Sequence, residues 1–548
     1  MKKVLLITLA LASLGGMVQA QTVYEAAKLN EEDIDGTARY VGMGGAMNAL
    51  GGDISVMKSN PAGIGIFRSN DLSLSFSYVN TATGSEAGRK GGMSFDDIGL
   101  VYANRVSGSG LLRFINIGFN YHKRRNFNNR TVSRRGGAGF NKSQTYQFAN
   151  MATQGTNRYG EPGYDPDQLD AKETFVTSNP YVGWLPAMAY QAYLIDPVYY
   201  ENEGRYEFDG EYTPYMQSGL FTSVDNYYES EESGWVNDYD FNISFNFSDR
   251  LYFGATLTAS DVRYRKTSLY KEDFYDDTTS PVYYGGGYDL KNYFSTKGSG
   301  LGFSAGVIYR PLSSMRVAFS FATPTIYWLN DYQESSIAYD VDAVIEGSVQ
   351  QVSGEVFPVD GHGNFIPYEY SYQVVTPWKL NVAVGGTLLN CLAFDAEYEF
   401  KNSAKTKLRD MDGIKLVYEN DAMSSWFKGQ HTFRAGVEAK PLPMLALRVG
   451  YNYTTALFDA FDASNADANA YKSLSPSAAR TDTEYSNSYA KQSISAGLGF
   501  RSRYFYADVA YQYSMYKQDF FEYDDVALLP VNLKTDRHQL LFTLGCRF

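Results

Sequence analysis

Fourteen segments of this 548-residue chain alternate apolar and polar side chains with a period of two, as strands with one apolar face do. The clearest segment is 239–247, where Tyr239, Phe241 and Ile243 alternate with Asp240 and Asn242. From residue 71 to residue 548, the connections between these segments are alternately long and short. Strict alternation of long loops and short turns, with an even number of strands, is typical of bacterial outer-membrane barrels. The sequence therefore predicts an all-β fold, a 14-stranded antiparallel transmembrane β-barrel.

A soluble β-sandwich is the alternative, and the distribution of charge disfavours it. Glu397, Arg434 and Arg448 all fall in the polar phase of their segments, while the other phase stays apolar. In a barrel the apolar face meets lipid and the polar face meets the lumen. A further alternating stretch at 368–374 would invert the topology if it crossed the membrane, so we expect it to be a hairpin arm above the membrane.

The first 20 residues have the features of a secretory signal peptide: Lys2 and Lys3, an apolar run at 4–14, and small residues up to Ala20. No later stretch of 18 apolar residues follows, which excludes ordinary membrane-spanning helices. We therefore expect the cell outer membrane of a Gram-negative bacterium, with both ends of the mature chain at the periplasmic, short-turn side of the barrel.

Residues 21–70 precede the strands and are rich in glycine. A solvated linker would carry Ser, Glu and Lys, whereas this segment contains apolar residues such as Val41, Met47 and Ile64. We expect it to fold inside the barrel as a hatch, with a mobile linker as the alternative. The predicted division is then a signal peptide at 1–20, a hatch at 21–70 and the barrel at 71–548, whose largest connection is 122–235.

Several classes of function find no support in the sequence. The net charge of -13 argues against nucleic-acid binding, which needs a basic surface. The four histidines are dispersed without metal-ligand spacing, and no nucleophile motif accompanies them. We therefore expect neither an enzyme nor a metal or cofactor site.

The segment Thr37-Ala38-Arg39-Tyr40-Val41-Gly42-Met43-Gly44-Gly45-Ala46, followed by Asn60-Pro61-Ala62, resembles the N-terminal hatch of the FadL family of long-chain fatty-acid and hydrocarbon transporters. Thr376-Pro377-Trp378 and the stretch 433–451 extend the similarity. The resemblance implies a hatch that closes the lumen and an inward kink in an early strand that opens a side window into the bilayer, with Gly118 as the candidate kink. Asn60, Pro61 and Ala62 would be the gate contacts. The end of the chain at Phe548 is similar to the signal that barrel assembly machinery recognises.

The leading functional hypothesis is passive uptake of hydrophobic small molecules such as fatty acids, gated by the hatch, with lateral release into outer-membrane lipid. Candidate contacts for a ligand carboxylate are Arg316, Arg434 and Arg448, although pairing with lumenal acids such as Glu397 and Glu438 is the alternative for them. Candidate residues of an apolar capture loop are Trp184, Leu185, Met188 and Leu194, for which ordinary packing of the loop on itself is the alternative.

Two hypotheses of other classes remain. Some barrels that resemble this family carry client proteins in type IX secretion, and co-purification with secreted clients would favour that function. The long, Tyr-rich connections would also suit a surface adhesin or a structural barrel.

Overall fold

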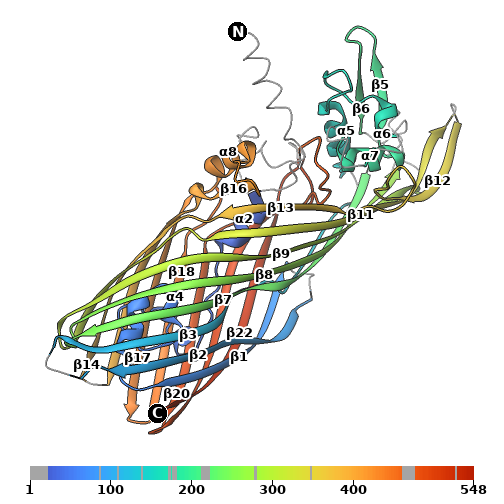
Figure 1. The fold of residues 1–548 in the computed structure, drawn as a ribbon. Coiled ribbons are helices and arrows are strands. Elements are labelled where there is room, and N and C mark those ends of the chain that lie inside the picture. Colours follow the sequence, from blue (N-terminus) through green and yellow to red (C-terminus); the bar gives the residue numbers. More distant parts are fainter. Residues whose placement is uncertain are drawn as a thin grey trace, which may run out of the picture.

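The structure is a computed structural model of the chain (Figure 1). It describes residues 23–84, 88–107, 110–137, 140–170, 174–175, 182–210, 223–276, 281–345, 348–389, 391–459, 475–524 and 528–548. The predicted signal peptide at 1–20 lies outside the described residues.

Fourteen strands pair into a closed antiparallel ring, as the alternation predicts. In ring order these are β1 (Asp71–Thr83), β2 (Lys90–Arg105), β3 (Leu112–Asn126), β7 (Ser223–Phe247), β8 (Leu251–Asp276), β9 (Tyr283–Leu312), β10 (Met315–Ala322), β14 (Lys379–Leu388), β15 (Leu392–Asn402), β17 (Gly429–Leu442), β18 (Leu445–Thr454), β20 (Lys491–Arg501), β21 (Phe505–Phe521) and β22 (Val531–Arg547). Pairing of the whole of β1 with residues 535–547 of β22 closes the barrel.

The outside of the ring is apolar and the inside is polar. On β7, Phe241 and Ile243 are exposed, whereas Asp240 and Asn242, which alternate with them, are buried in the lumen. The same alternation of exposed apolar and buried polar side chains recurs around the ring, because a strand that separates lipid from a filled lumen places its apolar side chains outward. The surface of the ring is therefore suited to hydrocarbon rather than to water.

Several segments that the alternation marks as long loops are instead strands. The alternation ends near residue 262 on β8 and resumes near residue 300 on β9, which predicts a long loop at 263–299. Instead, β8 runs on to Asp276 and β9 starts at Tyr283, so most of that connection is a two-stranded ribbon. Above the lipid the outward face becomes polar, and the apolar contrast that reveals a strand in sequence disappears there. β11 (Ile326–Ile345) pairs with the upper part of β9 and with β13 (Tyr368–Val375), which confirms that 368–374 is an arm and not a crossing.

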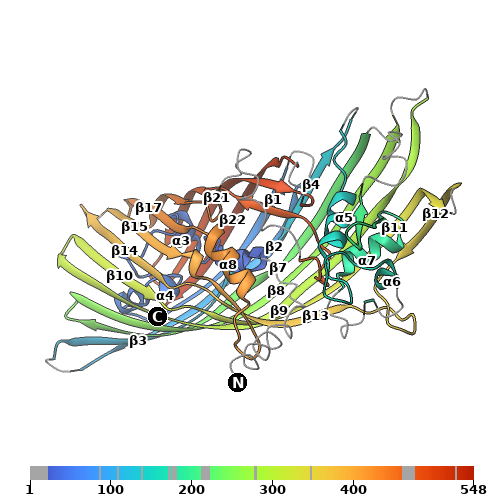
Figure 2. The same cartoon turned by 90° about the horizontal axis from the view of Figure 1, so that it is seen from above.

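A domain that we call the loop-end domain stands at the end of the barrel opposite the C-terminus (Figures 1 and 2). It comprises α5 (Thr145–Gln154), α6 (Pro166–Leu169), α7 (Trp184–Gln191) and the hairpin β5 (Asp196–Tyr200) with β6 (Arg205–Asp209). Further elements at this end are β4 (Asn129–Arg135), β12 (Ser348–Val356), η2 (Ser403–Lys405), β16 (Lys407–Asp410), α8 (Val417–Trp426) and β19 (Tyr485–Ser488). One buried apolar cluster joins the domain to the upper strands.

Among the described residues, no helix is long and apolar enough to span a membrane.

The N-terminal segment lies inside the ring. It contains α2 (Val23–Asn30), α3 (Ala38–Gly42), α4 (Val56–Ser59) and η1 (Pro61–Ile66). The C-terminus lies at the short-turn end (Figure 1), but the expectation that the mature chain also starts there is wrong for the described residues. Helix α2 lies at the loop end, because the ring of Tyr24 stacks between Phe458 and Tyr485 at 5.5 Å from each.

Candidate functional site

The lumenal segment, residues 36–67, packs against the inner wall through glycines on both partners. A Cβ on Gly44 would lie 2.6 Å from the backbone nitrogen of Tyr451 on β18. Gly436 and Gly450 of the facing strands have no room for a Cβ either, because the backbone of Met43 and Gly44 occupies that space. Gly44 also has a φ of +67°, which favours glycine. The glycine-rich composition therefore serves a backbone-to-backbone contact with the wall.

The motif residues Asn60, Pro61 and Ala62 lie against β8 and β9. Asn60 begins η1, where its Oδ1 accepts a hydrogen bond from the backbone of Ala62 and its Nδ2 donates to Asn48 at 2.9 Å. Gly254 and Gly306 on these strands leave room for the motif, which fills the space that a Cβ on either glycine would need. The motif is thus a rigid turn seated on the inner wall.

Two lumenal carboxylates hold the middle of the segment. Asp395 accepts hydrogen bonds from the backbone of Ala49 and Leu50 at 2.9 and 2.7 Å. Glu397, next but one on β15, accepts from the backbone of Met47 and Asn48 at 2.6 and 2.7 Å. Four consecutive N–H groups that no helix or sheet satisfies are therefore bound by the wall.

The three candidate arginines bond to carboxylates or to a backbone carbonyl of the protein. Arg434 lies 3.5 Å from Glu397 and 3.2 Å from Glu399. The fully buried Arg448 bonds to Glu438 at 2.8 Å and to Asp508 at 2.5 Å, and Arg39 of the lumenal segment approaches the same Glu438 at 2.9 Å. Pairing with lumenal acids, the alternative given for these residues, is confirmed for Arg434 and Arg448.

Arg316 completes the set by donating to the backbone carbonyl of Leu50. The predicted role of the three arginines toward a ligand carboxylate stays a prediction. Arg434 is among the residues that border a cavity.

Sequence reasoning missed an acidic run, Glu31-Glu32-Asp33, that crosses the lumen between α2 and α3. Its three carboxylates reach different strands, in ion pairs of 2.7 to 2.9 Å: Glu31 with Arg125, Glu32 with Lys379, and Asp33 with Lys491 and Arg537. The available signal is three adjacent acids together with basic residues in the lumenal phase of β14, β20 and β22. Arg125 lies in the outward phase of β3 and is brought inward by the bulge at Arg124, so its phase gives no such signal.

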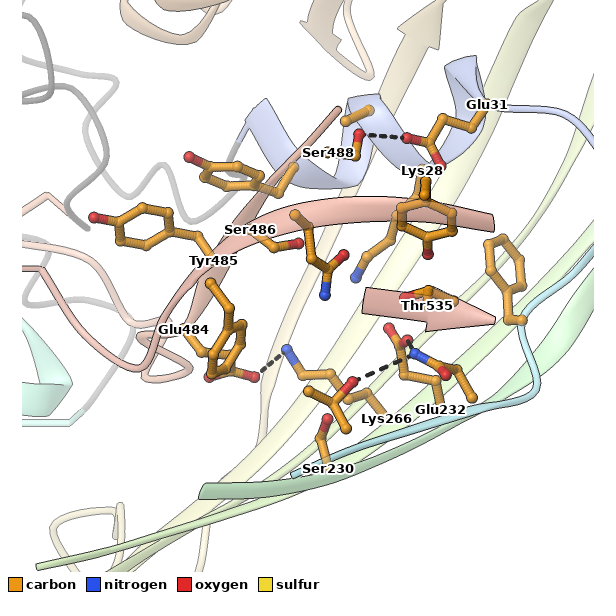
Figure 3. A pocket seen from close by; sticks show the side chains of 18 of the residues that line it. Lys28, Glu31, Ser230, Glu232, Lys266, Glu484, Tyr485, Ser486, Ser488 and Thr535 are labelled. Atoms are coloured by element: carbon orange, nitrogen blue, oxygen red, sulfur yellow. Dashed lines mark hydrogen bonds and ion pairs between the residues drawn. The ribbon is translucent and has the colours of Figure 1, made fainter. Parts of the chain in front are cut away.

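Two cavities lie in the lumen on the loop side of the lumenal segment. The upper cavity, about 200 Å³, lies between α2, the segment 480–488 and the upper strands (Figure 3). The lower cavity, about 140 Å³, lies between the acidic run and the lumenal segment. Glu31, Asp33, Ser488, Lys491 and Tyr516 border both, so the two cavities adjoin at the acidic run.

The lining of the upper cavity combines aromatic rings with charged groups. Phe127, Tyr228 and Phe520 contribute rings, and Lys28 and Arg480 contribute cations. Figure 3 shows Lys28 and Lys266 turned toward the same space, with Lys266 bonded to Glu484. Burial raises the pKa of Glu25, but the Arg480 guanidinium 2.7 Å away outweighs it and lowers that pKa to about 2.

The side wall is irregular between β2 and β3. Their ladder is continuous from Arg105 to Asp97, which pairs with His122, and ends there. Beyond this point β2 remains paired only with β1, with a bulge at Asp96. β3 remains paired only with β7, with a bulge at Arg124. Gly118, the candidate for the kink, pairs regularly with both neighbouring strands, so the expectation that it forms the kink is wrong. Its lack of a side chain makes room for the side chain of Met57.

The candidate capture residues lie in the interior of the loop-end domain. Leu185, Met188 and Leu194 have no exposed surface, and Trp184 is 4% exposed. They pack with one another and with the upper strands in one cluster. Ordinary packing, the alternative given for this loop, describes their geometry.

Comparison with known proteins gives matches in structure only. No protein-family model matches the chain, and neither does any curated protein. Among solved structures, a FadL homologue of Pseudomonas aeruginosa is 11% identical, with 94% of this chain and 99% of that chain covered and a TM-score of 0.47. The similarity to this FadL homologue is one of structure alone.

Two toluene transporters are similar to this chain in structure to a comparable degree. TodX of P. putida is 10% identical, with 94% of this chain and 99% of that chain covered and a TM-score of 0.44. TbuX of Ralstonia pickettii is 13% identical, with the same coverage and a TM-score of 0.43. At these values the resemblance carries no argument about a ligand, and the architecture stands on the strand pairing described above.

Proposed function

We propose that the protein is an outer-membrane channel for passive uptake of hydrophobic small molecules, fatty acids in particular, with residues 21–70 as its hatch. The observation that carries the proposal is the lumenal segment, which fills a barrel with a lipid-compatible exterior. It is held to the wall by hydrogen bonds to carboxylates such as Asp395 and Glu397, by ion pairs, and by small apolar clusters such as that of Val41 with Leu541. Polar contacts of this kind can be exchanged for water, so the segment is suited to leaving its seat and returning.

The cavities support an amphipathic ligand. Burial of each methylene of an alkyl chain contributes about 0.8 kcal/mol, so such a chain does not cross a water-filled pore unaided. The upper cavity offers aromatic surface beside Lys28 and Arg480, and the two cavities follow one another toward the lumenal segment. An alkyl or aromatic body with an anionic head matches that lining.

We propose that release is lateral, between β2 and β3. The ladder between these strands ends at Asp97 and His122, and His122 also borders the lower cavity. At the same level Lys123 donates a hydrogen bond to Ser94 at 2.6 Å, which connects the two strands across the gap. An apolar ligand leaving there enters lipid without crossing water. Asn60, Pro61 and Ala62 remain our candidates for the gate, through their seat on β8 and β9.

A disulfide between hatch and wall tests the gating directly. A Cβ on Gly385 of β14 would lie 3.2 Å from the Cβ of Ala49, a few tenths of an ångström short of usual disulfide spacing. In a background with Cys391→Ser and Cys546→Ser, the variant Ala49→Cys/Gly385→Cys should take up radiolabelled oleate normally under reducing conditions. Uptake should fall to the level of cells without the protein once the bond forms, and return with reductant.

A matched control places the bond within the wall. Ser493 and Ser514 pair directly across β20 and β21, so Ser493→Cys/Ser514→Cys cross-links two strands without restraining the hatch. Unchanged uptake by the oxidised Ala49/Gly385 variant would refute hatch gating. If the reduced protein takes up no oleate and instead co-purifies with secreted proteins, the proposed cargo is wrong and a client shuttle is favoured.

A further inference from the structure

The outward face of β7, β8, β9 and β11 changes from apolar to cationic over two rows of paired residues. The last apolar row joins Tyr239, Ala259, Leu301 and Ile326, which pair in succession across the four strands. The next row holds Asp261, Ser299 and Trp328. The row above it joins Trp235, Arg263, Lys297 and Asn330.

The aromatic residues of these rows locate the membrane boundary. Trp235 and Trp328 stand just beyond the last apolar row, where tryptophan is enriched in membrane proteins because its amphipathic ring suits the headgroup level. The Trp235 indole N–H donates to Asp261 at 3.1 Å, and the guanidinium of Arg263 lies 5.7 Å from the ring centre. Arg263 and Lys297 are therefore held at headgroup depth on the loop side.

The pairing of Arg263 with Lys297 is unfavourable for the protein alone. They lie directly opposite each other on adjacent antiparallel strands, where like charges destabilise a sheet. Arg265, two residues further along β8, is also exposed on this face. Asp261 is the nearest carboxylate, 3.9 Å from Arg263, while Arg265 and Lys297 form no ion pair with any described residue.

We infer that Arg263, Arg265 and Lys297 form a binding site for the phosphate of a phosphorylated lipid in the outer leaflet. An anion between the paired side chains removes their repulsion, with the arginine fork bonding two phosphate oxygens and the lysine acting as a point charge. A lipid is the occupant because the site adjoins the apolar row, where acyl chains lie below the headgroup. The inference rests on the outer-membrane location in the proposed function and is independent of transport.

Binding of bisphosphorylated lipid A to the detergent-purified protein, measured by native mass spectrometry, tests the site. The variant Arg263→Gln/Arg265→Gln/Lys297→Gln should lose affinity about fivefold per side chain, on the order of 100-fold in all. The same glycolipid without its phosphates should bind the wild-type protein no better than the triple variant binds the phosphorylated form. A control that alters charge equally at the short-turn end, Arg105→Gln/Arg113→Gln/Arg503→Gln, should bind like the wild-type protein.

The outcomes separate the lipid site from its alternatives. Equal binding by wild-type protein and triple variant, or equal binding of the dephosphorylated lipid, would overturn the inference. Competition by inorganic phosphate at concentrations similar to those of the lipid would assign a free-anion site instead. Lys297→Gln provides a further check, since removing a repelled charge should leave the unfolding temperature of lipid-free protein equal or higher, whereas loss of a structural residue would lower it.

Discussion

Replacing Gly44 by alanine should unseat the hatch while leaving the barrel intact. The added Cβ would lie 2.6 Å from the backbone nitrogen of Tyr451 and 3.0 Å from its carbonyl oxygen, where ordinary contacts are 3.4 Å or more. These are atoms of a paired strand, which cannot rotate away as a side chain can. The residue also has a φ of +67°, which costs a non-glycine residue about 1–2 kcal/mol.

A second hatch glycine separates the two contributions. Gly52 has nearly the same φ, +66°, but a Cβ there would meet only Ile66 at 3.7 Å. Gly52→Ala therefore bears the backbone cost alone, whereas Gly44→Ala adds overpacking of about 1–3 kcal/mol. That difference corresponds to a further rise of about 5- to 150-fold in the unseated fraction, because every 1.4 kcal/mol is tenfold.

Conductance of single barrels in planar lipid bilayers measures the unseated fraction as the frequency of open events. Gly44→Ala should open about 5- to 150-fold more often than Gly52→Ala, which should itself exceed the wild-type protein by about 5- to 30-fold through the backbone cost alone. Heat-modifiable mobility in gels should show equal amounts of folded barrel for all three proteins. Equal conductance of the two variants would refute the claim that the glycine-to-wall contact seats the hatch.

Two further predictions concern the loop end. Arg480→Ala should release α2, since Glu25 loses its buried partner at an expected cost of about 3–5 kcal/mol, and faster hydrogen exchange at 23–30 would reveal it, whereas unchanged exchange would contradict it. Burial in α8 raises the pKa of Glu419 to about 7 from an unfolded value near 4.5, so the folded loop binds the proton more tightly. The stability of α8 should thus be greatest below about pH 4.5 and fall as the pH rises through 7, and hydrogen exchange of α8 in Glu419→Gln should lose this dependence.

The barrel was accessible to sequence reasoning because lipid on one side and a filled lumen on the other impose one contrast on every crossing. Tyr239 to Ile243 on β7 is the clearest example, since every second residue reports its face directly. The same contrast fails above the membrane, where Arg263 and Arg265 are the outward residues of β8 and nothing apolar marks the strand. For that reason the alternation predicts loops where the structure has ribbons and the loop-end domain.

The site was predictable in kind but not in its contacts. Glycine and apolar residues together indicated a segment that packs against backbone, and Gly44 against β18 is the physical reason. The partners of Glu31, Glu32 and Asp33 lie between 94 and 504 residues away in the chain, a distance over which no periodicity specifies a contact. Arg448 could be placed in the lumen by its phase, but its bonds to Glu438 and Asp508 depend on how three strands meet.

The length of β9 fixes the distance of the loop-end domain from the apolar band of the barrel. Its 30 residues extend about 100 Å along the strand, or roughly 70 Å along the membrane normal at a usual tilt near 45°. An outer-membrane barrel needs an apolar band only about 25 Å tall, so roughly 45 Å of β9 extends beyond that band. Since β8 pairs with β9 along this length, a paired ribbon and not a flexible linker supports the domain. The domain is therefore held at a fixed distance from the apolar band of the barrel.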